Sequence, residues 1–333
     1  MSKPQAQARS AIKLDLFADA ARKRKIETLG DPLQVIARHI DFDELTRVID
    51  QLLPTGDGAK GGRPPYPSAV MVRILILKYL YKLSDEQMEY QLLDRMSYQR
   101  FCLLADSANV PDRNTIWHYQ QRLGVDGVTA LFQAVDGQLL QRGYLARCGQ
   151  IIDATLVPAP IQHFTKQDKE QLDQGKIPSD WNEAKRRQKD LDATHTKKHG
   201  KGYHGYKLSI SVDVRHKFIR KITTGTASEH DSTHFDEVHD EHNTSCDVYA
   251  DRGYPSEQRS EMLKVLGYRE HIQRKAKPGK PLSECQKGRN KRIAKTRARV
   301  EHPFAQMRHM GGKFIRTIGQ ARATVAMTMM AAC

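Results

Sequence analysis

Apolar residues recur at helical spacing through the first 145 residues of the chain. Val48 and Ile49, for example, follow Leu45 by three and four residues, and Leu52 follows them by four and three, the spacing that places side chains on one face of a helix. The stretch after Pro67 is apolar on nearly all sides, which predicts a buried helix. The pattern therefore predicts several helices joined by turns in this half of the chain.

The periodicity changes at Gly149, where strand patterns begin. Residues 150–157 form a short apolar run, and apolar and polar residues alternate strictly over 206–213, the period of two that predicts a strand. Further apolar runs at 218–226 and 246–250 are followed by helical patterns. We therefore expect an α/β (α+β) fold class, with an all-helical region followed by a mixed sheet that helices flank.

The charge of the chain narrows the class of partner. Its 54 Lys and Arg against 39 Asp and Glu give a net charge of +15, and a protein this basic favours an anionic polymer as partner. The window 264–320 alone holds 16 Lys and Arg against three Glu, and a second basic cluster precedes the alternating strand. Two such clusters in one half of the chain favour contact with a phosphate backbone over a merely solvated surface.

Several classes of protein are excluded by the absence of their patterns. No apolar run approaches the ~20 residues of a membrane span, and the N-terminus lacks the apolar stretch of a secretory signal. We therefore expect a cytoplasmic protein with no membrane partner. The five cysteines are scattered without a CxxC pair, which indicates reduced thiols. No GxGxxG or Walker pattern is present, so no nucleotide cofactor is expected.

Three acids stand in settings that suggest chemistry. Asp153 lies inside one apolar run, Asp251 ends another, and Glu301 lies between Arg297 and Arg308. A buried strand carboxylate is costly unless a cation or hydrogen bonds compensate it, and a cluster of carboxylates suits Mg²⁺ or Mn²⁺. The alternative for each residue alone is structural: Asp153 paired with a lysine, and Asp251 forming a turn. On a straight helix the two arginines would share a face with Glu301.

Seven segments, in a fixed order, resemble one family. They are GRPPYPSAVMVRILILKYLYKLSDEQMEYQLLDRMSYQRF, VPDRNTIWHYQQRL, IIDATLV, TKKHGKGYHGYKLSISVD, TASEHDS, VYADRGY and RARVEHPFAQMR. Together they resemble the DDE transposases of bacterial insertion sequences, most closely the insertion-sequence-five group. The resemblance implies a ribonuclease-H-like catalytic domain whose three acids map onto Asp153, Asp251 and Glu301.

The resemblance also implies a reaction, its cofactors and its partners. The three acids would hold two Mg²⁺ ions, for which Mn²⁺ can substitute, and these would serve cleavage at the ends of a mobile element and strand transfer into target DNA. The implied partners are double-stranded DNA, at the element's terminal inverted repeats and at the target, and a second copy of the chain in a homodimer or higher oligomer. The protein would be bacterial and associated with the nucleoid when bound to DNA.

The same resemblance divides the chain into two domains. Residues 1–145 are expected to form a helical domain for DNA binding or dimerisation, whose first 30 residues are a flexible arm. Residues 146–333 are expected to form the catalytic domain, with a polar insertion at 158–202.

The predicted DNA contacts lie in the catalytic half. The family's tyrosine–arginine–glutamate–lysine signature maps onto Arg297, Glu301 and Arg308, with Ala294 where the tyrosine is expected. Further candidates are cations near the predicted strands and one aromatic side chain that could stack on a base: Lys197, Lys198, Lys201, Lys207, Arg252 and Trp181.

Two other classes of function stay open from the residues alone. One is a DNA-binding protein without catalysis, such as a decayed transposase that acts as a repressor, although the three intact acids count against decay. The other is a metallohydrolase that binds zinc through the histidines clustered at 195–204 and 230–242, although it would not need so basic a segment. Mg²⁺-dependent nicking of DNA would distinguish a transposase from a DNA-binding protein without catalysis. Salt-dependent DNA binding would distinguish both of these from the metallohydrolase.

Overall fold

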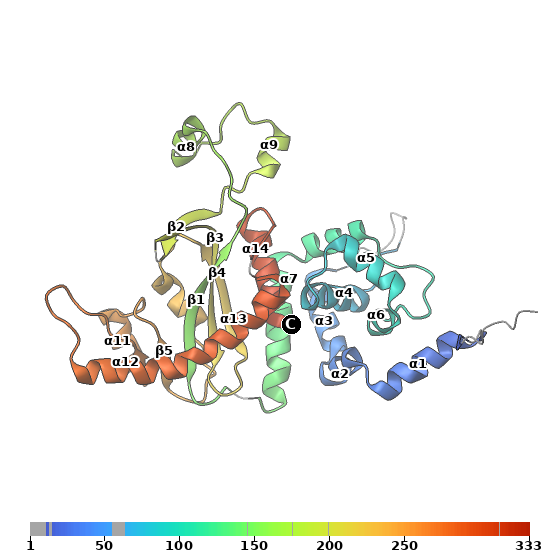
Figure 1. Ribbon diagram of the computed structural model, residues 1–333, viewed down its shortest axis with the longest axis horizontal. Coiled ribbons are helices and arrows are strands. Elements are labelled where there is room, and N and C mark those ends of the chain that lie inside the picture. Colours follow the sequence, from blue (N-terminus) through green and yellow to red (C-terminus); the bar gives the residue numbers. More distant parts are fainter. Residues whose placement is uncertain are drawn as a thin grey trace, which may run out of the picture.

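Seven helices make up the N-terminal half of the described chain (Figure 1). The computed structural model describes residues 11–12, 15–54, 64–144, 146–174, 176–198, 200–312 and 314–333. The helices are α1 (Ala18–Leu29), α2 (Pro32–His39), α3 (Phe42–Leu52), α4 (Ser68–Leu80), α5 (Asp85–Asp94), α6 (Met96–Phe101) and α7 (Arg113–Gln141). Within the described ranges, no helix of the chain is both long and apolar enough to cross a bilayer.

Side-chain caps fix where several of these helices begin. The Asp41 carboxylate accepts two backbone N–H bonds at the start of α3, which begins this helix separately from α2. Ser84 and Gln87 form the expected capping box of α5, and Asp112 caps α7. These boundaries therefore follow from local hydrogen bonds that the sequence already contains.

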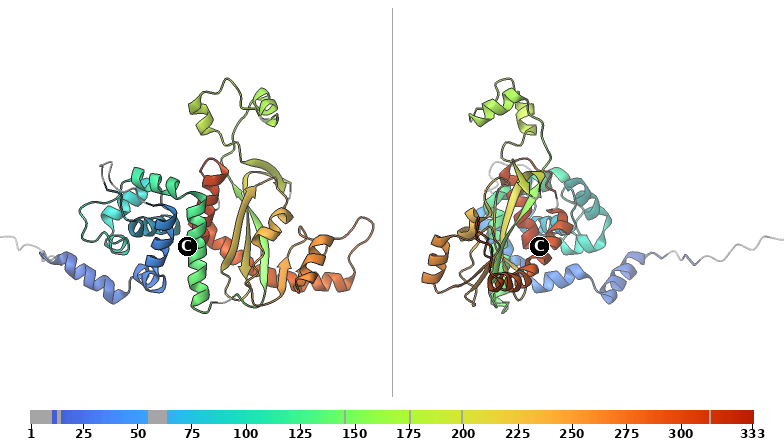
Figure 2. Two further views of the ribbon diagram at one scale, coloured as in Figure 1. Left: turned by 180° about the vertical axis from the view of Figure 1, so that it is seen from behind. Right: turned by 60° about the vertical axis from the view of Figure 1, so that its left-hand side comes forward.

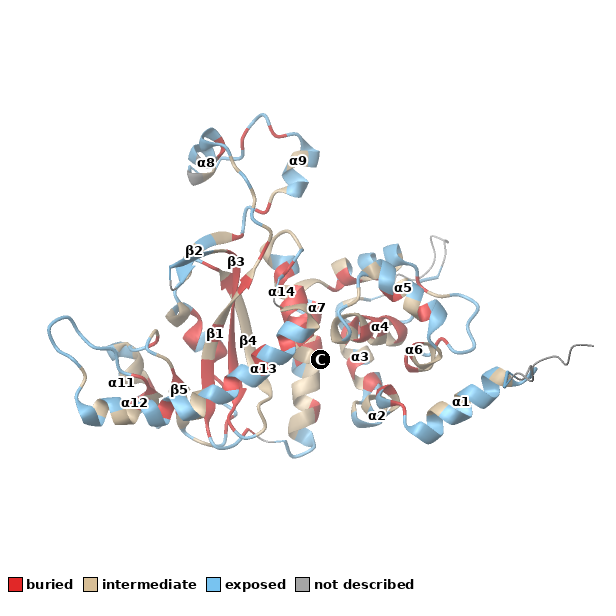
Figure 3. Cartoon of the chain, viewed as in Figure 1, coloured by how far each residue is buried: buried red, intermediate tan, exposed pale blue. Residues whose placement is uncertain are grey.

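The expected flexible arm contains a helix. None of the residues of α1 is buried, and the helix projects beyond the rest of the helical half (Figure 3). The predicted arm over 1–30 therefore contains a helix at Ala18–Leu29, and residues 1–10, 13 and 14 lie outside the described part of the chain.

The core of the helical half includes the last helix of the chain. Ile74 and Leu77 of α4 are fully buried, and Val325 and Met329 of α14 (Gln320–Ala332) belong to the same cluster. α14 packs along α7, which is kinked at Gly124. The two halves of the molecule therefore share buried apolar surface.

Six strands form a mixed sheet, which confirms the predicted fold class of a helical region followed by a mixed-sheet domain. They are β1 (Gln150–Pro158), β2 (Thr194–Lys198), β3 (Lys201–Asp213), β4 (Ile219–Thr226), β5 (Asp247–Ala250) and β6 (Arg269–Ile272). β1 pairs with β3 in antiparallel fashion and with β5 in parallel fashion, and β6 continues the parallel edge. β3 pairs with β2 near its start and with β4 along most of its length.

Helices cover both faces of the sheet. They are η1 (Asp231–His234), α10 (Phe235–Val238), α11 (Glu257–Val265), α12 (Glu284–Arg297), η2 (Ala298–Val300), α13 (Glu301–Met307), the π-helical turn η3 (Arg308–Gly312) and α14. Ile151 packs in one cluster with Phe304 of α13, whereas the next residue, Ile152, packs in another with Leu263 of α11. Because alternate strand residues point to opposite faces, β1 is the buried centre of the domain.

The polar segment over 158–202 contains its own small core. It holds α8 (Lys166–Asp173) and α9 (Glu183–Gln188) and projects from the end of the sheet (Figure 2). Trp181 is only 3% exposed, donates its indole N–H to Asp168 at 3.0 Å and stacks on Phe164. The predicted stacking of Trp181 on a DNA base is therefore wrong, because its ring is used inside the protein.

Arg297, Glu301 and Arg308 do not lie on one straight helix. α12 starts at the capping box of Ser283 and Gln286, and the turn η2 separates it from α13. Pro303 has no backbone N–H to donate near the start of α13. Arg297 and Glu301 consequently belong to consecutive helical segments.

Candidate active site

Two of the three predicted acids lie next to each other on parallel strands. Ile151 of β1 pairs with Tyr249 of β5, and the same register continued by two residues places Asp153 opposite Asp251, which directly follows β5. β1 continues while β5 ends, so the acids lie at the carboxyl end of β5 beside the open flank of β1. The chain leaves β1 toward β3 and leaves β5 toward β6 on the other side. Such a switch point is where open α/β sheets bind ligands.

Asp153 is held by an arginine from α12. A terminal guanidinium nitrogen of Arg297 lies 2.6 Å from Asp153 Oδ2, and the two side chains are 17% and 14% exposed. The other oxygen, Oδ1, accepts the N–H of Ala154 at 2.9 Å. Burial raises the pKa of Asp153 to about 6, with Arg297 opposing the shift and the charge of Asp251 adding to it.

Asp251 begins a turn that carries a buried tyrosine. Its Oδ1 accepts the N–H of Gly253 at 2.6 Å. The next residue, Tyr254, is fully buried, and its hydroxyl has no hydrogen-bond partner among the residues described. Burial and the charges of Asp153, Asp231 and Asp251 raise the pKa of this phenol. The Tyr254 hydroxyl is therefore a buried polar atom without a hydrogen-bond partner in the described part of the chain.

The third predicted acid is not joined to the other two. Glu301 is the exposed first residue of α13, four residues after Arg297, which reaches Asp153. No described interaction links Glu301 with Asp153 or Asp251, and no group of three or more His, Cys, Asp or Glu side chains in the described ranges could hold a metal ion. The structure thus brings together two acids and places the third on the helical segment that follows their arginine.

The donors at this site suit a hard divalent cation. Carboxylate oxygens are the ligands that Mg²⁺ and Mn²⁺ prefer, and Asp153 and Asp251 present them from neighbouring strands. The Tyr254 hydroxyl adds a buried oxygen without a partner, and such atoms are rare in folded proteins. The chemistry of the donor set therefore fits a Mg²⁺-type ion, whereas Glu301 does not complete it in this conformation.

A basic cavity opens beside the acids. It has a volume of about 760 Å³, and Gly253 of the Asp251 turn lines it together with five cations: Arg252, Arg274, Lys275, Lys277 and Lys280. None of the five forms an ion pair in the part of the chain that the structure describes. Because unpaired cations that converge on one cavity attract anions, the cavity can receive phosphate groups next to the carboxylates.

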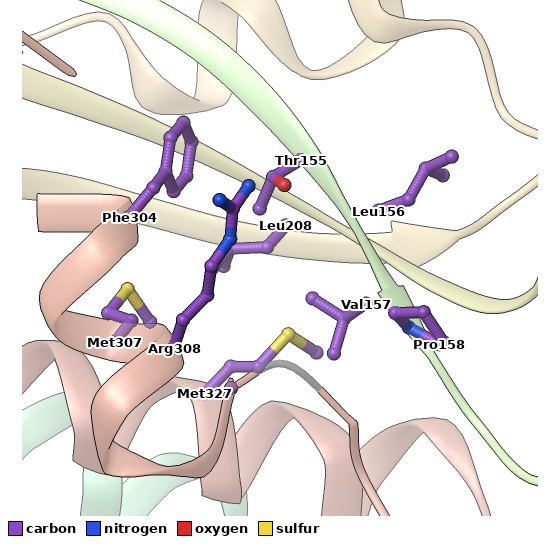
Figure 4. A pocket seen from close by; sticks show the side chains of 10 residues that line it. Thr155, Leu156, Val157, Pro158, Leu208, Phe304, Met307, Arg308 and Met327 are labelled. Atoms are coloured by element: carbon purple, nitrogen blue, oxygen red, sulfur yellow. The ribbon is translucent and has the colours of Figure 1, made fainter. Parts of the chain in front are cut away.

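A second cavity holds the last residue of the predicted signature. Arg308, at the end of α13, is exposed, and Figure 4 shows its guanidinium extending toward Thr155 and Leu208. This cavity has a volume of about 400 Å³. Thr155 lies two residues after Asp153 on the same face of β1. Arg297 and Arg308 therefore both reach β1, at successive points along the strand.

The four predicted lysine contacts differ in their exposure. Lys197 and Lys198 of β2 and Lys201 of β3 are exposed on one hairpin. Lys207 is only 7% exposed, and its ammonium group lies 2.6 Å from a carboxylate oxygen of Asp231. The prediction that Lys207 contacts DNA is therefore wrong, because this cation is buried and paired within the protein. Asp231 and Tyr254 were not predicted as catalytic, metal-binding or DNA-binding residues, although both lie in segments that resemble the family, TASEHDS and VYADRGY.

The histidines of the alternative zinc site have other partners. His234 lies 2.6 Å from Glu229 and 3.3 Å from Glu237. The rings of His195 and His204 contact each other with their centroids 4.3 Å apart. His199 lies outside the described residues. These histidines lie apart from Asp153 and Asp251 in every described contact.

Two family models match the chain. The model described as Transposase DDE domain matches residues 144–333, and the model described as Transposase domain (DUF772) matches residues 21–122. The first match covers more than half of the chain, all six strands and all three predicted acids. No solved structure matches the chain.

Proposed function

The chain belongs to the transposase DDE domain family, and we propose that it is the transposase of an insertion sequence of the insertion-sequence-five group. Members of the family cleave DNA and transfer its strands with a ribonuclease-H-like domain. It binds the terminal inverted repeats of its element, cleaves the DNA there and joins the ends to target DNA. The observation that carries this proposal is the position of Asp153 and Asp251, each two residues beyond the last parallel pair of β1 and β5.

We assign the catalytic roles to Asp153, Asp251 and Glu301, which would hold two Mg²⁺ ions or Mn²⁺ in their place. Bound there, the metal supplies Lewis-acid stabilisation of the attacking and departing oxygens of a phosphodiester. Arg297 forms an ion pair with Asp153 in the folded chain. A DNA phosphate is an anion that can replace Asp153 as the partner of this arginine. Binding of DNA therefore frees Asp153 at the moment when its carboxylate is needed.

The residues expected to contact DNA are the exposed cations around the acids. Arg252 lines the basic cavity beside Asp251, and Arg308 lies along β1 beyond Asp153. Lys197, Lys198 and Lys201 extend the basic surface on the β2–β3 hairpin. Contacts of this kind go to phosphates and position the duplex, while sequence must be read elsewhere.

We propose that the helical half reads the inverted repeats or joins two copies of the chain. The match to a transposase domain over residues 21–122 supports this assignment. The proposed domain boundary between residues 145 and 146 separates α1–α7 from the strands in sequence. α14 nevertheless packs onto the helical half.

Cleavage of a supercoiled plasmid that carries the element ends tests this function. The wild-type protein should nick the plasmid in Mg²⁺ but not in EDTA, and Asp153→Asn and Asp251→Asn should bind the ends without nicking them. Asp236→Asn, an exposed acid of α10, is the matched control and should retain both activities. Nicking by Asp153→Asn would contradict the assignment, and binding without nicking by the wild type in any divalent cation would favour the repressor.

A further inference from the structure

α1 is a helix that packs against no core of the protein. None of the residues of Ala18–Leu29 is buried, and the helix projects from the rest of the helical half in more than one view (Figures 1 and 2). Isolated helices shorter than about 12–15 residues are marginal in water, and most protein helices owe their stability to packing. A partner that covers α1 would therefore supply the stabilisation that the fold does not give it.

Four consecutive cations run around this helix. They are Arg22, Lys23, Arg24 and Lys25. Arg22 pairs with Asp19 at 2.9 Å, whereas the other three form no ion pair within the described ranges. Three adjacent cations without counter-ions attract a polyanion, so the charge of α1 indicates what kind of partner covers it.

The order of residues in α1 does not suit a protein partner. A helix that packs on protein carries an apolar stripe at steps of three and four residues. The apolar residues of α1 are three alanines in its first turn, then Ile26 and Leu29, and the cations separate the two groups. No apolar stripe therefore runs along this helix.

The three unpaired cations point in different directions. At about 100° per residue, Lys23 and Lys25 lie on nearly opposite sides of the helix, with Arg24 between them. Ala20 and Ala21 lie within about 60° of Arg24, so small side chains flank the arginine on that face. The major groove of DNA is about 12 Å wide and admits a helix, with a phosphate backbone on each side and base edges at its floor. The three directions match these three elements of the groove.

The last turn of α1 is tied to the helical half. The carboxylate of Glu27 lies 3.0 Å from the guanidinium of Arg100 on α6, and the two side chains are 58% and 23% exposed. This ion pair anchors the end of the helix and neutralises the acid that follows the cations. The match to a transposase domain begins at residue 21, so the cationic segment belongs to the matched region.

We propose that α1 lies in the major groove of the duplex at the element end, with Lys23 and Lys25 against the phosphates of the two strands and Arg24 at the base edges. The proposal rests on the proposed function, because it takes element-end DNA as the ligand, and it names the helix through which the helical half binds that DNA. The lysines position the helix, and Arg24 supplies sequence preference through hydrogen bonds to a base such as guanine.

Salt-dependent DNA binding tests the two lysines. Fluorescence anisotropy of the full-length protein uses a labelled duplex of the terminal repeat and a scrambled duplex of equal composition. Lys23→Gln/Lys25→Gln should bind both duplexes more weakly and should lower the slope of log affinity against log salt by about 2, since each phosphate contact contributes about 0.9. Arg47→Gln/Arg142→Gln, which removes two exposed cations of the same half, should leave the slope unchanged.

Arg24 has a separate readout. Arg24→Ala should weaken binding to the repeat about fivefold or more beyond its effect on the scrambled duplex, the discrimination expected of a base contact. Ile26→Pro breaks the helix but keeps every cation, and it should bind the repeat as weakly as Lys23→Gln/Lys25→Gln. Because no residue of α1 is buried, these changes should leave the circular dichroism of the remaining helices intact.

The outcomes separate this inference from the proposed function. If the wild type binds the repeat no better than the scrambled duplex, the proposed recognition of the inverted repeats is wrong, whereas the slope of the lysine variant still tests the phosphate contacts. If the wild type prefers the repeat and the lysine variant keeps its slope, only the assignment of α1 is overturned. Wild-type affinity in Ile26→Pro would show that the cations act as an extended tail and would overturn the groove placement. Loss of a dimer in sedimentation of the lysine variant, with DNA binding unchanged, would assign α1 to a contact between copies instead.

Discussion

Replacing Asp153 with asparagine should stabilise the protein when divalent cations are absent, and should do so only above about pH 4. Burial raises the pKa of Asp153 from 3.8 to about 6, against the opposing effect of Arg297. An acid with a higher pKa in the folded than in the unfolded protein holds its proton more tightly when folded. The folded state therefore loses stability as the pH rises from about 4 to about 6.

The size of this effect follows from the two pKa values. A rise from 3.8 to about 6 corresponds to about 3 kcal/mol, since one pKa unit is worth about 1.4 kcal/mol. Asparagine has nearly the same shape as a protonated aspartate but cannot ionise. The free energy of unfolding of Asp153→Asn should therefore equal that of the wild type near pH 4 and exceed it by up to about 3 kcal/mol above pH 7.

Urea unfolding in EDTA, followed by circular dichroism between about pH 4 and pH 8, measures this difference. Added Mg²⁺ should stabilise the wild type and leave the asparagine variant unchanged, because only the protein that binds the ion gains free energy from it. A variant less stable than the wild type at pH 7.5, or a difference that does not change with pH, would refute the reasoning.

Three further predictions concern other parts of the molecule. Gly253→Ala places a Cβ 3.0 Å from a carboxylate oxygen of the site, so Mg²⁺-dependent nicking should fall, whereas Gly137→Ala, which meets nothing within 4 Å, should nick as the wild type does. Arg220→Met breaks a buried ion pair with Asp136 at 2.5 Å and should lower the free energy of unfolding by about 3–5 kcal/mol; a loss below about 1 kcal/mol in urea would contradict this. Burial raises the pKa of the Cys102 thiol, so this thiol should react with a disulfide reagent only after unfolding, and rapid labelling of the native protein, located by peptide mapping, would contradict that.

Local patterns predicted most of the sheet, though not β2 within the polar segment, and they singled out two of its acids. The alternation of β3 and the apolar run of β1 each follow from burial on defined faces, and Asp153 stood out because it interrupts an apolar run. The capping box at Ser84 is likewise a local hydrogen-bond pattern. That Asp153 and Asp251 belong to one site followed from the family resemblance, because the parallel pairing of β1 with β5 cannot be seen in either local pattern.

Contacts between distant segments could not be predicted in this way. Lys207 and Trp181 each looked like exposed DNA contacts, and both are buried by partners that the sequence pattern does not identify. Arg297 was expected to face DNA and instead lies 2.6 Å from Asp153. Nor does helical spacing show that Glu301 begins a new segment after η2, because that break depends on how α12 and α13 pack on the sheet.

The position of α14 has a consequence for synthesis on the ribosome. Val325 and Met329 of α14 complete the core built by α4 and the other helices that precede the sheet, so those helices cannot finish packing until α14 has been translated. Contacts of such long sequence separation slow folding, and chaperones must protect the exposed apolar surface meanwhile. A transposon insertion or nonsense mutation before residue 320 would therefore destabilise the helical half as well as the half it truncates.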